Sequence, residues 1–254
     1  MKSPSINRLL VAFLGCVAGG LLTADLIVQA GDRQSPLATT NSPELLNDFK
    51  KWTFDAQKEG EAPAGFSPVT VGQAGAGTWT LIQDQKAPSA PLVLQQGTPC
   101  RASDCFHVLL VDGVTYDYPE MAVQMRATPV SPGTGGVVVG AKDGSNGYAV
   151  LVDLKANVLE FLVLKDGKAT KLGEAAITPK KVDWHHLRVQ RNTIISKEYF
   201  EVFFDGKLWL SVEDKQWGAG QVGLVTRGDG QMAFDSLAVS PLFSSRALSP
   251  PAAY

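Results

Sequence analysis

The stretch Gly135–Asp153, GGVVVGAKDGSNGYAVLVD, contains two apolar runs separated by a short polar segment. The runs VVVGA and YAVLV are rich in valine and are as short as buried strands, whereas helices are usually longer. Between them lies the dipeptide Asn146-Gly147, which tolerates the positive φ angles of a hairpin turn. The stretch therefore predicts two antiparallel strands joined by a tight turn.

The same pattern extends over most of the chain. From Trp52 to Val239, short apolar or alternating runs recur every 8 to 14 residues, and Asp-Gly pairs begin at Asp112, Asp166 and Asp205. No segment of ten or more residues in this region has a helical period. Many short strands with such turns are typical of a β-sandwich or a barrel. We predict an all-β fold, a two-sheet jelly-roll sandwich over residues 52–241.

The N-terminus has the features of a signal peptide. Lys2 and Arg8 precede the apolar run LLVAFLGCVAGGLL, and Val28-Gln29-Ala30 is a suitable cleavage site. The run is shorter than the roughly 18 to 20 residues that a membrane span needs. An uncleaved anchor and lipidation at Cys16 are the alternatives. We predict a signal peptide over 1–30, a leader over 31–51, a loose tail over 242–254, and a periplasmic or secreted mature domain that does not insert into a membrane.

Composition and charge narrow the classes of partner. The 254 residues carry a formal net charge of −2, with 44% hydrophobic and 19% charged residues. This balance is typical of a globular domain. The chain has no cluster of Lys and Arg that would attract a phosphate backbone. The sequence therefore argues against a nucleic-acid partner.

Two cysteines remain once the first thirty residues are removed. Cys100 and Cys105 lie close together in the segment CRASDC, and in an exported protein two such cysteines most simply form one local disulfide. The alternatives are free thiols or a metal site with Asp104 and His107. A structural zinc site needs four ligands at defined spacing, and no second Cys/His pair is present in the sequence. We predict the disulfide.

Alternation within the predicted strands indicates a polar and aromatic outer face on one sheet. In WHHLRVQ the apolar pair Leu187 and Val189 belongs to the core, so His186 and Arg188 lie on the opposite face. By the same parity the outer face receives Arg126, Glu201 and Trp209, whereas Leu208 and Leu210 turn inward. Aromatic rings beside charged groups suit sugar binding, because rings stack on sugars while charges bind hydroxyls. The alternative is that loops or the leader cover these side chains.

The order of the segments GGVVVGAKDGSNGYAVLVD, VLEFLVLKDGK, WHHLRV, FEVFFDGK, GQVGLVT and FDSLAV resembles the concanavalin A-like, laminin-G-like sandwich. In particular, the chain is similar to bacterial exported domains related to the 3-keto-disaccharide hydrolase group, which is family 16 glycoside hydrolase-like. The resemblance covers Trp52–Val239 and implies carbohydrate binding or hydrolysis. At two positions where the family pattern has arginine, this chain has Gly140 and Leu151.

Catalytic chemistry has few candidates in this sequence. A retaining glycosidase needs two carboxylates about 5 to 5.5 Å apart on one face, and the sequence offers only Glu120 and Glu201 as weak candidates. His185 and His186 face opposite sides of a strand, so they cannot share one ion; we expect His185 to be partly buried and hydrogen-bonded.

Calcium is a further alternative, with Asp143 as one ligand and Asp229, from another loop, as the second. The segment from Asp143 to Tyr148, including Asn146, would then form the rim of a ligand site. The other interpretation of this segment is a turn without a ligand.

We therefore predict an exported, non-catalytic domain that binds a glycan or polysaccharide. The expected binding residues are Arg126, Asp143, Asn146, Tyr148, His186, Arg188, Glu201 and Trp209. No cofactor is expected apart from calcium. A glycoside hydrolase and an envelope protein-interaction or structural module with a protein partner remain the alternatives.

Overall fold

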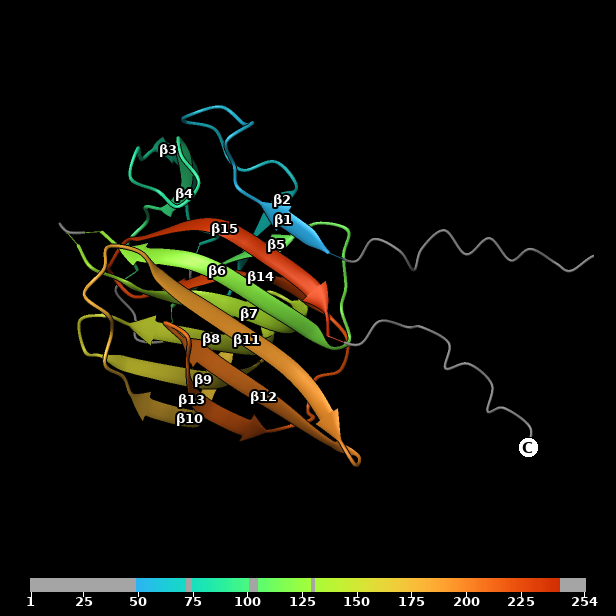
Figure 1. Cartoon of the computed structure of the whole chain (residues 1–254). Helices are drawn as coiled ribbons and strands as arrows, with labels where there is room; N and C mark the ends of the chain where they lie inside the picture. Colours follow the sequence, from blue (N-terminus) through green and yellow to red (C-terminus); the bar gives the residue numbers. More distant parts are fainter. Residues whose placement is uncertain (1–48, 72–74, 101–104, 129–130, 243–254) are drawn as a thin grey trace, which may run out of the picture. The chain divides into compact units, whose positions relative to one another are not determined.

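The computed structural model describes residues 49–71, 75–100, 105–128 and 131–242 of the chain. The predicted signal peptide and nearly all of the predicted leader and tail lie outside these residues. The described part consists of strands joined by turns and loops (Figure 1), and contains no helix long and apolar enough to cross a membrane.

The strands form two sheets, and all pairs of neighbouring strands are antiparallel. Sheet A has the order β13-β12-β11-β6-β15-β4-β3, with β1 also paired to β15; sheet B has the order β10-β9-β8-β7-β14-β5-β2. The bounds in sheet A are β1 (Lys50–Trp52), β3 (Trp79–Gln83), β4 (Leu92–Gln96), β6 (Pro119–Ala127), β11 (His185–Ile194), β12 (Lys197–Phe204), β13 (Lys207–Glu213) and β15 (Met232–Pro241). The bounds in sheet B are β2 (Phe66–Thr70), β5 (Phe106–Val111), β7 (Thr134–Asp143), β8 (Asn146–Asp153), β9 (Val158–Lys165), β10 (Lys168–Ala176) and β14 (Gln221–Arg227).

One apolar core joins the facing sides of the two sheets. Sheet A contributes residues such as Val123, Leu187 and Val202, and sheet B contributes residues such as Val150 and Phe161. Each of these side chains is fully buried. The prediction of an all-β, two-sheet sandwich is confirmed, and the predicted hairpin is formed by β7 and β8.

Sheet B is also apolar on its outer side. A second buried cluster, which includes Val108, Val138, Leu151 and Leu162, lies there. Because apolar residues occupy both sides of β8, its burial pattern is continuous rather than alternating.

The strand ends define two ends of the sandwich. At one end, which we name the pocket end, β6, β8 and β14 finish and β7, β11 and β15 begin, as their registers show. At the opposite end, which we name the turn end, β7 and β8 are joined by the turn that contains Asn146.

Candidate functional site

A cavity with a polar lining lies at the pocket end. It has a volume of about 530 Å³, which is within the range of small-molecule sites. We name it the end pocket. Its lining residues come from the ends of β7, β8 and β14 and the loops beside them: Pro132, Gly133, Thr134, Asp153, Arg227, Gly228, Asp229 and Gly230.

Two glycines let the two loops of the end pocket approach closely. A Cβ atom at Gly230 would lie 2.0 Å from the Cα of Gly133, and one at Gly133 would lie 2.6 Å from the carbonyl carbon of Gly230. Real side chains do not fit at such distances, so residues with side chains would push the loops apart. Pro132 and Gln231, which flank the glycines, form an isolated parallel bridge that holds the two loops together.

Contacts on the outer side of sheet B fix the position of Arg227, the cationic residue of the end pocket. Arg227 donates a hydrogen bond to Glu160, and Lys171 lies 2.8 Å from the other carboxylate oxygen of Glu160. Burial alone would raise the pKa of Glu160, but the hydrogen bonds from Lys171 and Arg227 outweigh burial and lower that pKa. The Arg227 guanidinium is therefore held against an ionised carboxylate at the edge of the pocket.

The two carboxylates of the end pocket differ in their environment. Asp153 accepts hydrogen bonds from the backbone N–H groups of Lys155 and Ala156, at 2.9 and 2.8 Å, which fixes its position at the end of β8. Asp229 is exposed, in the loop between β14 and β15. With Thr134 and Arg227, the pocket therefore presents both hydrogen-bond acceptors and donors.

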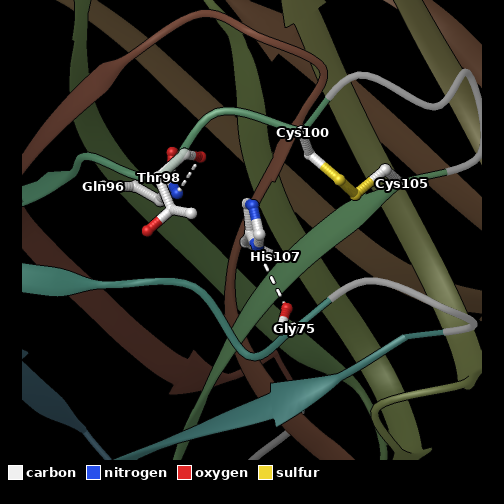
Figure 2. The surroundings of a disulfide bond; sticks show 6 residues. All are labelled: Gly75, Gln96, Thr98, Cys100, Cys105 and His107. Carbon is white, nitrogen blue, oxygen red and sulfur yellow. Dashed lines mark hydrogen bonds between the residues drawn. A yellow bond between two sulfur atoms is a disulfide. The ribbon is translucent and has the colours of Figure 1, made fainter.

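The predicted disulfide between Cys100 and Cys105 is present, and it supports one wall of the end pocket (Figure 2). The backbone N–H of Cys100 donates a hydrogen bond to the carbonyl of Gly228, with an N···O distance of 3.1 Å. Cys105 directly precedes β5, which pairs with β14. The disulfide thus joins the segment after β4 to the start of β5, and the Cys100 hydrogen bond connects that segment to the loop that lines the pocket.

The outer face of sheet A carries three of the predicted binding residues side by side. His186 and Arg188 project from β11, and Glu201 projects from the neighbouring β12. The Arg188 guanidinium lies 3.8 Å from the centre of the Phe203 ring. Burial first, and Arg188 second, lower the pKa of His186, so its imidazole is neutral at pH 7. Since Arg188 covers a face of Phe203, that side of the ring is closed to sugar stacking.

Arg126 lies apart from this group, near the pocket end. Its guanidinium is 2.6 Å from the Asp84 carboxylate and 4.9 Å from the centre of the Trp184 ring. Arg126 also lines a second cavity of about 410 Å³, together with Lys86 and His185. His185 is buried, as predicted, and its Nδ1 lies 2.9 Å from the Asp205 carboxylate.

Trp209 does not stand free on the outer face. Val202 pairs with Leu210 whereas Phe203 pairs with Leu208, so Trp209 is an extra residue in a bulge of β13. Its ring packs against the core, its Nε1 donates to the Phe204 carbonyl at 3.2 Å, and Lys207 lies 3.7 Å from the ring centre. The prediction that Leu208 faces the core is wrong, because the bulge leaves that side chain 44% exposed.

The two weak catalytic candidates share one row on the outer face of sheet A. Glu120 of β6 and Glu201 of β12 both pair with Gln190 of β11. Two strand spacings separate them, about 10 Å between backbones. Glu120 accepts hydrogen bonds from Gln190 and Arg188. The separation is larger than the roughly 5 to 5.5 Å that a retaining glycosidase needs between its carboxylates.

The loop at the turn end is a self-contained turn. Asp143 accepts hydrogen bonds from the backbone N–H of Ser145 and from the side-chain amide of Asn146. Asn146 in turn accepts one from the backbone N–H of Asp166 at 3.0 Å. Both predicted rim side chains are thus engaged in bracing two neighbouring turns.

Asp143 and Asp229 cannot share a calcium ion. Asp143 ends β7 at the turn end, whereas Asp229 lines the end pocket beside the start of β7. The strand between them is 10 residues long and spans about 30 Å at about 3.3 Å per residue. The predicted calcium pair is therefore wrong as a single site.

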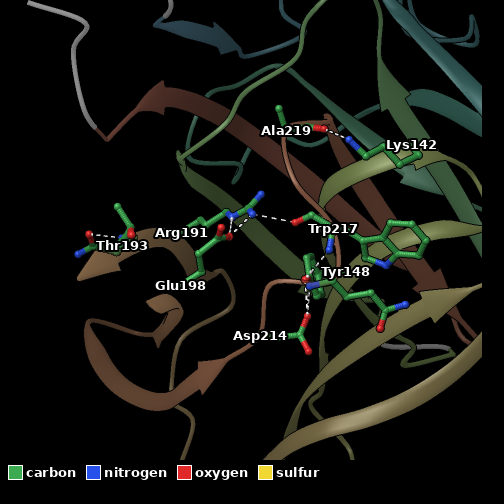
Figure 3. Close-up of polar contacts among 10 residues, drawn as sticks. Lys142, Tyr148, Arg191, Thr193, Glu198, Asp214, Trp217 and Ala219 are labelled. Carbon is green, nitrogen blue, oxygen red and sulfur yellow. Dashed lines mark hydrogen bonds and ion pairs between the residues drawn. The ribbon is translucent and has the colours of Figure 1, made fainter. Parts of the chain in front are cut away.

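Tyr148, predicted at the rim, is fully buried between the sheets (Figure 3). Its hydroxyl donates a hydrogen bond to Asp214 and accepts one from the Trp217 backbone N–H, with O···O and N···O distances of 2.5 and 2.9 Å. Burial, followed by the bond to Asp214, raises its pKa. Beside it, the buried Arg191 donates to Glu198 and to the Trp217 carbonyl. Tyr148 is a structural residue that cannot contact a glycan.

Sequence reasoning missed most of the end pocket. Of its lining residues, the sequence predicts a functional role only for Asp229, as a calcium ligand. The available signal was the position of Thr134, Asp153 and Arg227 at strand ends, next to glycines that bring two loops together. Strand alternation identifies faces of sheets, and it contains no information about cavities at strand ends.

Comparisons with known proteins identify similar structures rather than a family. No family model matches the sequence, and no curated protein matches it. The carbohydrate-binding module CBM66 from Bacillus subtilis is 20% identical, with a TM-score of 0.53 over 69% of this chain and 95% of that module. The cellulose induced protein Cip1 is 12% identical, with a TM-score of 0.51 over 75% of this chain and 96% of that protein.

At these identities the similarity shows the fold, which is the β-sandwich of these two structures. The relation to 3-keto-disaccharide hydrolases stays a prediction, because these comparisons do not show it.

Proposed function

We propose that this chain is an exported, non-catalytic module that binds a glycan, and that the end pocket holds the sugar. The observation that carries the proposal is the pocket itself: a cavity of about 530 Å³ whose lining includes carboxylates, a hydroxyl, a guanidinium and glycines. Export rests on the signal-peptide features of residues 1–30, and it makes the periplasm or the exterior the proposed location.

The chemistry of the lining matches that of a sugar. A hydroxyl group both donates and accepts hydrogen bonds, so a sugar needs acceptors and donors around it. Asp153 and Asp229 accept, Arg227 donates, and Thr134 does both. Because Asp153 and Arg227 are each held by other hydrogen bonds, their positions are set before a ligand arrives, which lowers the entropic cost of binding.

The fold supports the same conclusion at a coarser level. A similar sandwich occurs in the carbohydrate-binding module CBM66. The outer face of sheet A is the weaker site here, since cations cover a face of Phe203, of Trp209 and of Trp184.

The test is binding of the chain from Gly31 onward to a broad glycan panel, followed by calorimetry on the best ligand with two variants. We expect Asp229→Ala to weaken binding at least about tenfold, because it removes an exposed acceptor of the pocket. Arg188→Ala, on the outer face of sheet A, should bind like the wild type.

The reverse pattern, with loss in Arg188→Ala only, would place the sugar on the outer face of sheet A. If no glycan in the panel binds to the folded protein, the proposed function is wrong and an interaction with a protein partner becomes the better hypothesis. Product release from any sugar would favour the hydrolase alternative, and Glu120→Gln would then be the next variant.

A further inference from the structure

Cys100, Cys105 and His107 form a compact group beside the end pocket. One potential ligand atom from each residue lies within 4.8 Å of the other two. Among the described residues this is the one group of three or more such side chains close enough to hold a metal ion. The two sulfur atoms are joined in the disulfide, and His107 lies beside them (Figure 2).

The hydrogen bond of His107 defines which ring nitrogen is free. Its Nδ1 lies 3.0 Å from the carbonyl oxygen of Gly75, and a carbonyl oxygen only accepts, so Nδ1 carries the proton. Nε2 then has a lone pair. The side chain is 2% exposed, and Nε2 has no hydrogen-bond partner among the described residues. A buried polar atom without a partner is costly and calls for an explanation.

The ring is also held firmly in this orientation. A Cβ atom at Gly77 would lie 2.7 Å from Nδ1 of His107, so the segment Gly75–Gly77 passes directly against the imidazole. This arrangement is the one that metal-binding histidines use, in which one nitrogen donates to a backbone carbonyl and the other binds the metal. Here the side chain that carries the free nitrogen lies next to the two sulfur atoms of the disulfide (Figure 2).

We propose that, when the disulfide is reduced, Cys100, Cys105 and His107 bind one soft metal cation, with Cu(I) as the best match. Two thiolates and an imidazole are soft ligands that suit Cu(I). Structural zinc sites have four protein ligands, and this group supplies three. In the oxidised state the sulfurs are joined to each other, and the site is closed.

The chemistry balances with a dithiol as the reductant. The dithiol transfers two electrons and two protons to the disulfide and becomes a disulfide itself, which leaves thiols on Cys100 and Cys105. Binding of Cu(I) then displaces both thiol protons, and Nε2 donates its lone pair without losing a proton. Cys105 and His107 are buried, whereas Cys100 is half-buried, so the cation enters from the side of Cys100.

The experiment reduces the protein with a dithiol, removes the reductant without air, and titrates Cu(I) against a chromogenic copper chelator. We expect one Cu(I) per reduced chain and no binding to the oxidised chain. Cys100→Ser with Cys105→Ser should abolish binding. His107→Asn keeps a donor near the position of Nδ1 but lacks Nε2, and it should bind at least about tenfold more weakly.

Thermal melting of His107→Asn shows whether the fold is kept, and His185→Asn, at the other buried histidine, is the matched control with unchanged affinity. The proposal is overturned if the reduced wild type does not bind Cu(I), or if a folded His107→Asn binds it as tightly as the wild type. Tighter binding of Zn(II) than of Cu(I) in the same competition format would also contradict it.

Discussion

Asp235 is a fully buried carboxylic acid in β15, close to a second carboxyl. It accepts hydrogen bonds from the backbone N–H groups of Ser89 and Ser236. Burial is the largest effect on this group, and together with the nearby Asp55 it raises the pKa to about 6. The two backbone hydrogen bonds act in the opposite direction but do not cancel the effect of burial.

This raised pKa predicts a specific pH dependence of stability. Between pH 3.8 and about 6 the folded protein holds a proton that the unfolded chain has released, so the contribution of Asp235 is lost as the pH rises through this range. Urea unfolding at several pH values should show that the wild type loses more stability than Asp235→Asn as the pH rises from about 4 to about 6. A difference between the two proteins that stays constant over this range would contradict the assignment.

Tyr148 gives a second prediction at this scale. Tyr148→Phe removes the hydrogen bonds of the hydroxyl with Asp214 and with the Trp217 N–H, and the net loss for one hydrogen bond is about 0.5–1.5 kcal/mol. We expect the free energy of unfolding to fall by about 2 kcal/mol, measured in urea. The half-exposed Tyr199→Phe serves as the control and should change it by less than about 0.5 kcal/mol.

The sequence could not place Tyr148 correctly for a physical reason. Alternation assigns a side chain to a face only when one side of the sheet is polar, and the interior of β8 is buried on both sides. In β11, where buried and half-buried residues alternate, the same reasoning placed His185, His186 and Arg188 correctly. Alternation also assigns Leu208 of β13 to the wrong face, because a bulge changes the facing of the residues on one side of it.

At the scale of elements, the end pocket depends on two loops that touch through their backbones. A methyl group at Gly230 would collide with the backbone of Gly133. We expect Gly230→Ala to lower the free energy of unfolding by about 1–3 kcal/mol, the usual cost of overpacking, and to weaken glycan binding.

Gly97→Ala is the matched control for this prediction, because nothing lies within 4 Å of its Cβ position. Thermal melting and calorimetry on both variants provide the measurements. If Gly230→Ala melts and binds like Gly97→Ala, the close approach of the two loops is not needed for the pocket.

At the scale of the molecule, the two-sheet architecture could be predicted from the sequence and the main site could not. Strand periodicity and Asp-Gly turns are local properties, so Gly135–Asp153 and its neighbours already specify the sandwich. The end pocket joins residues that are up to 98 positions apart, from Pro132 to Gly230, and only the strand order brings them together. The same limit explains why Asp143 and Asp229 were paired although they lie at opposite ends.

The separation of these two carboxylates leads to a final prediction, that glycan binding does not depend on calcium. Both oxygens of Asp143 accept hydrogen bonds from Asn146, and about 30 Å of β7 separates this turn from Asp229. In the end pocket the cationic Arg227 lies beside Asp153 and Asp229, and its charge disfavours a divalent cation there. We expect the same affinity and melting temperature in calcium and in EDTA, measured by calorimetry and thermal melting on the same sample. Loss of binding in EDTA, restored by calcium but not by magnesium, would show that a calcium ion completes the sugar site.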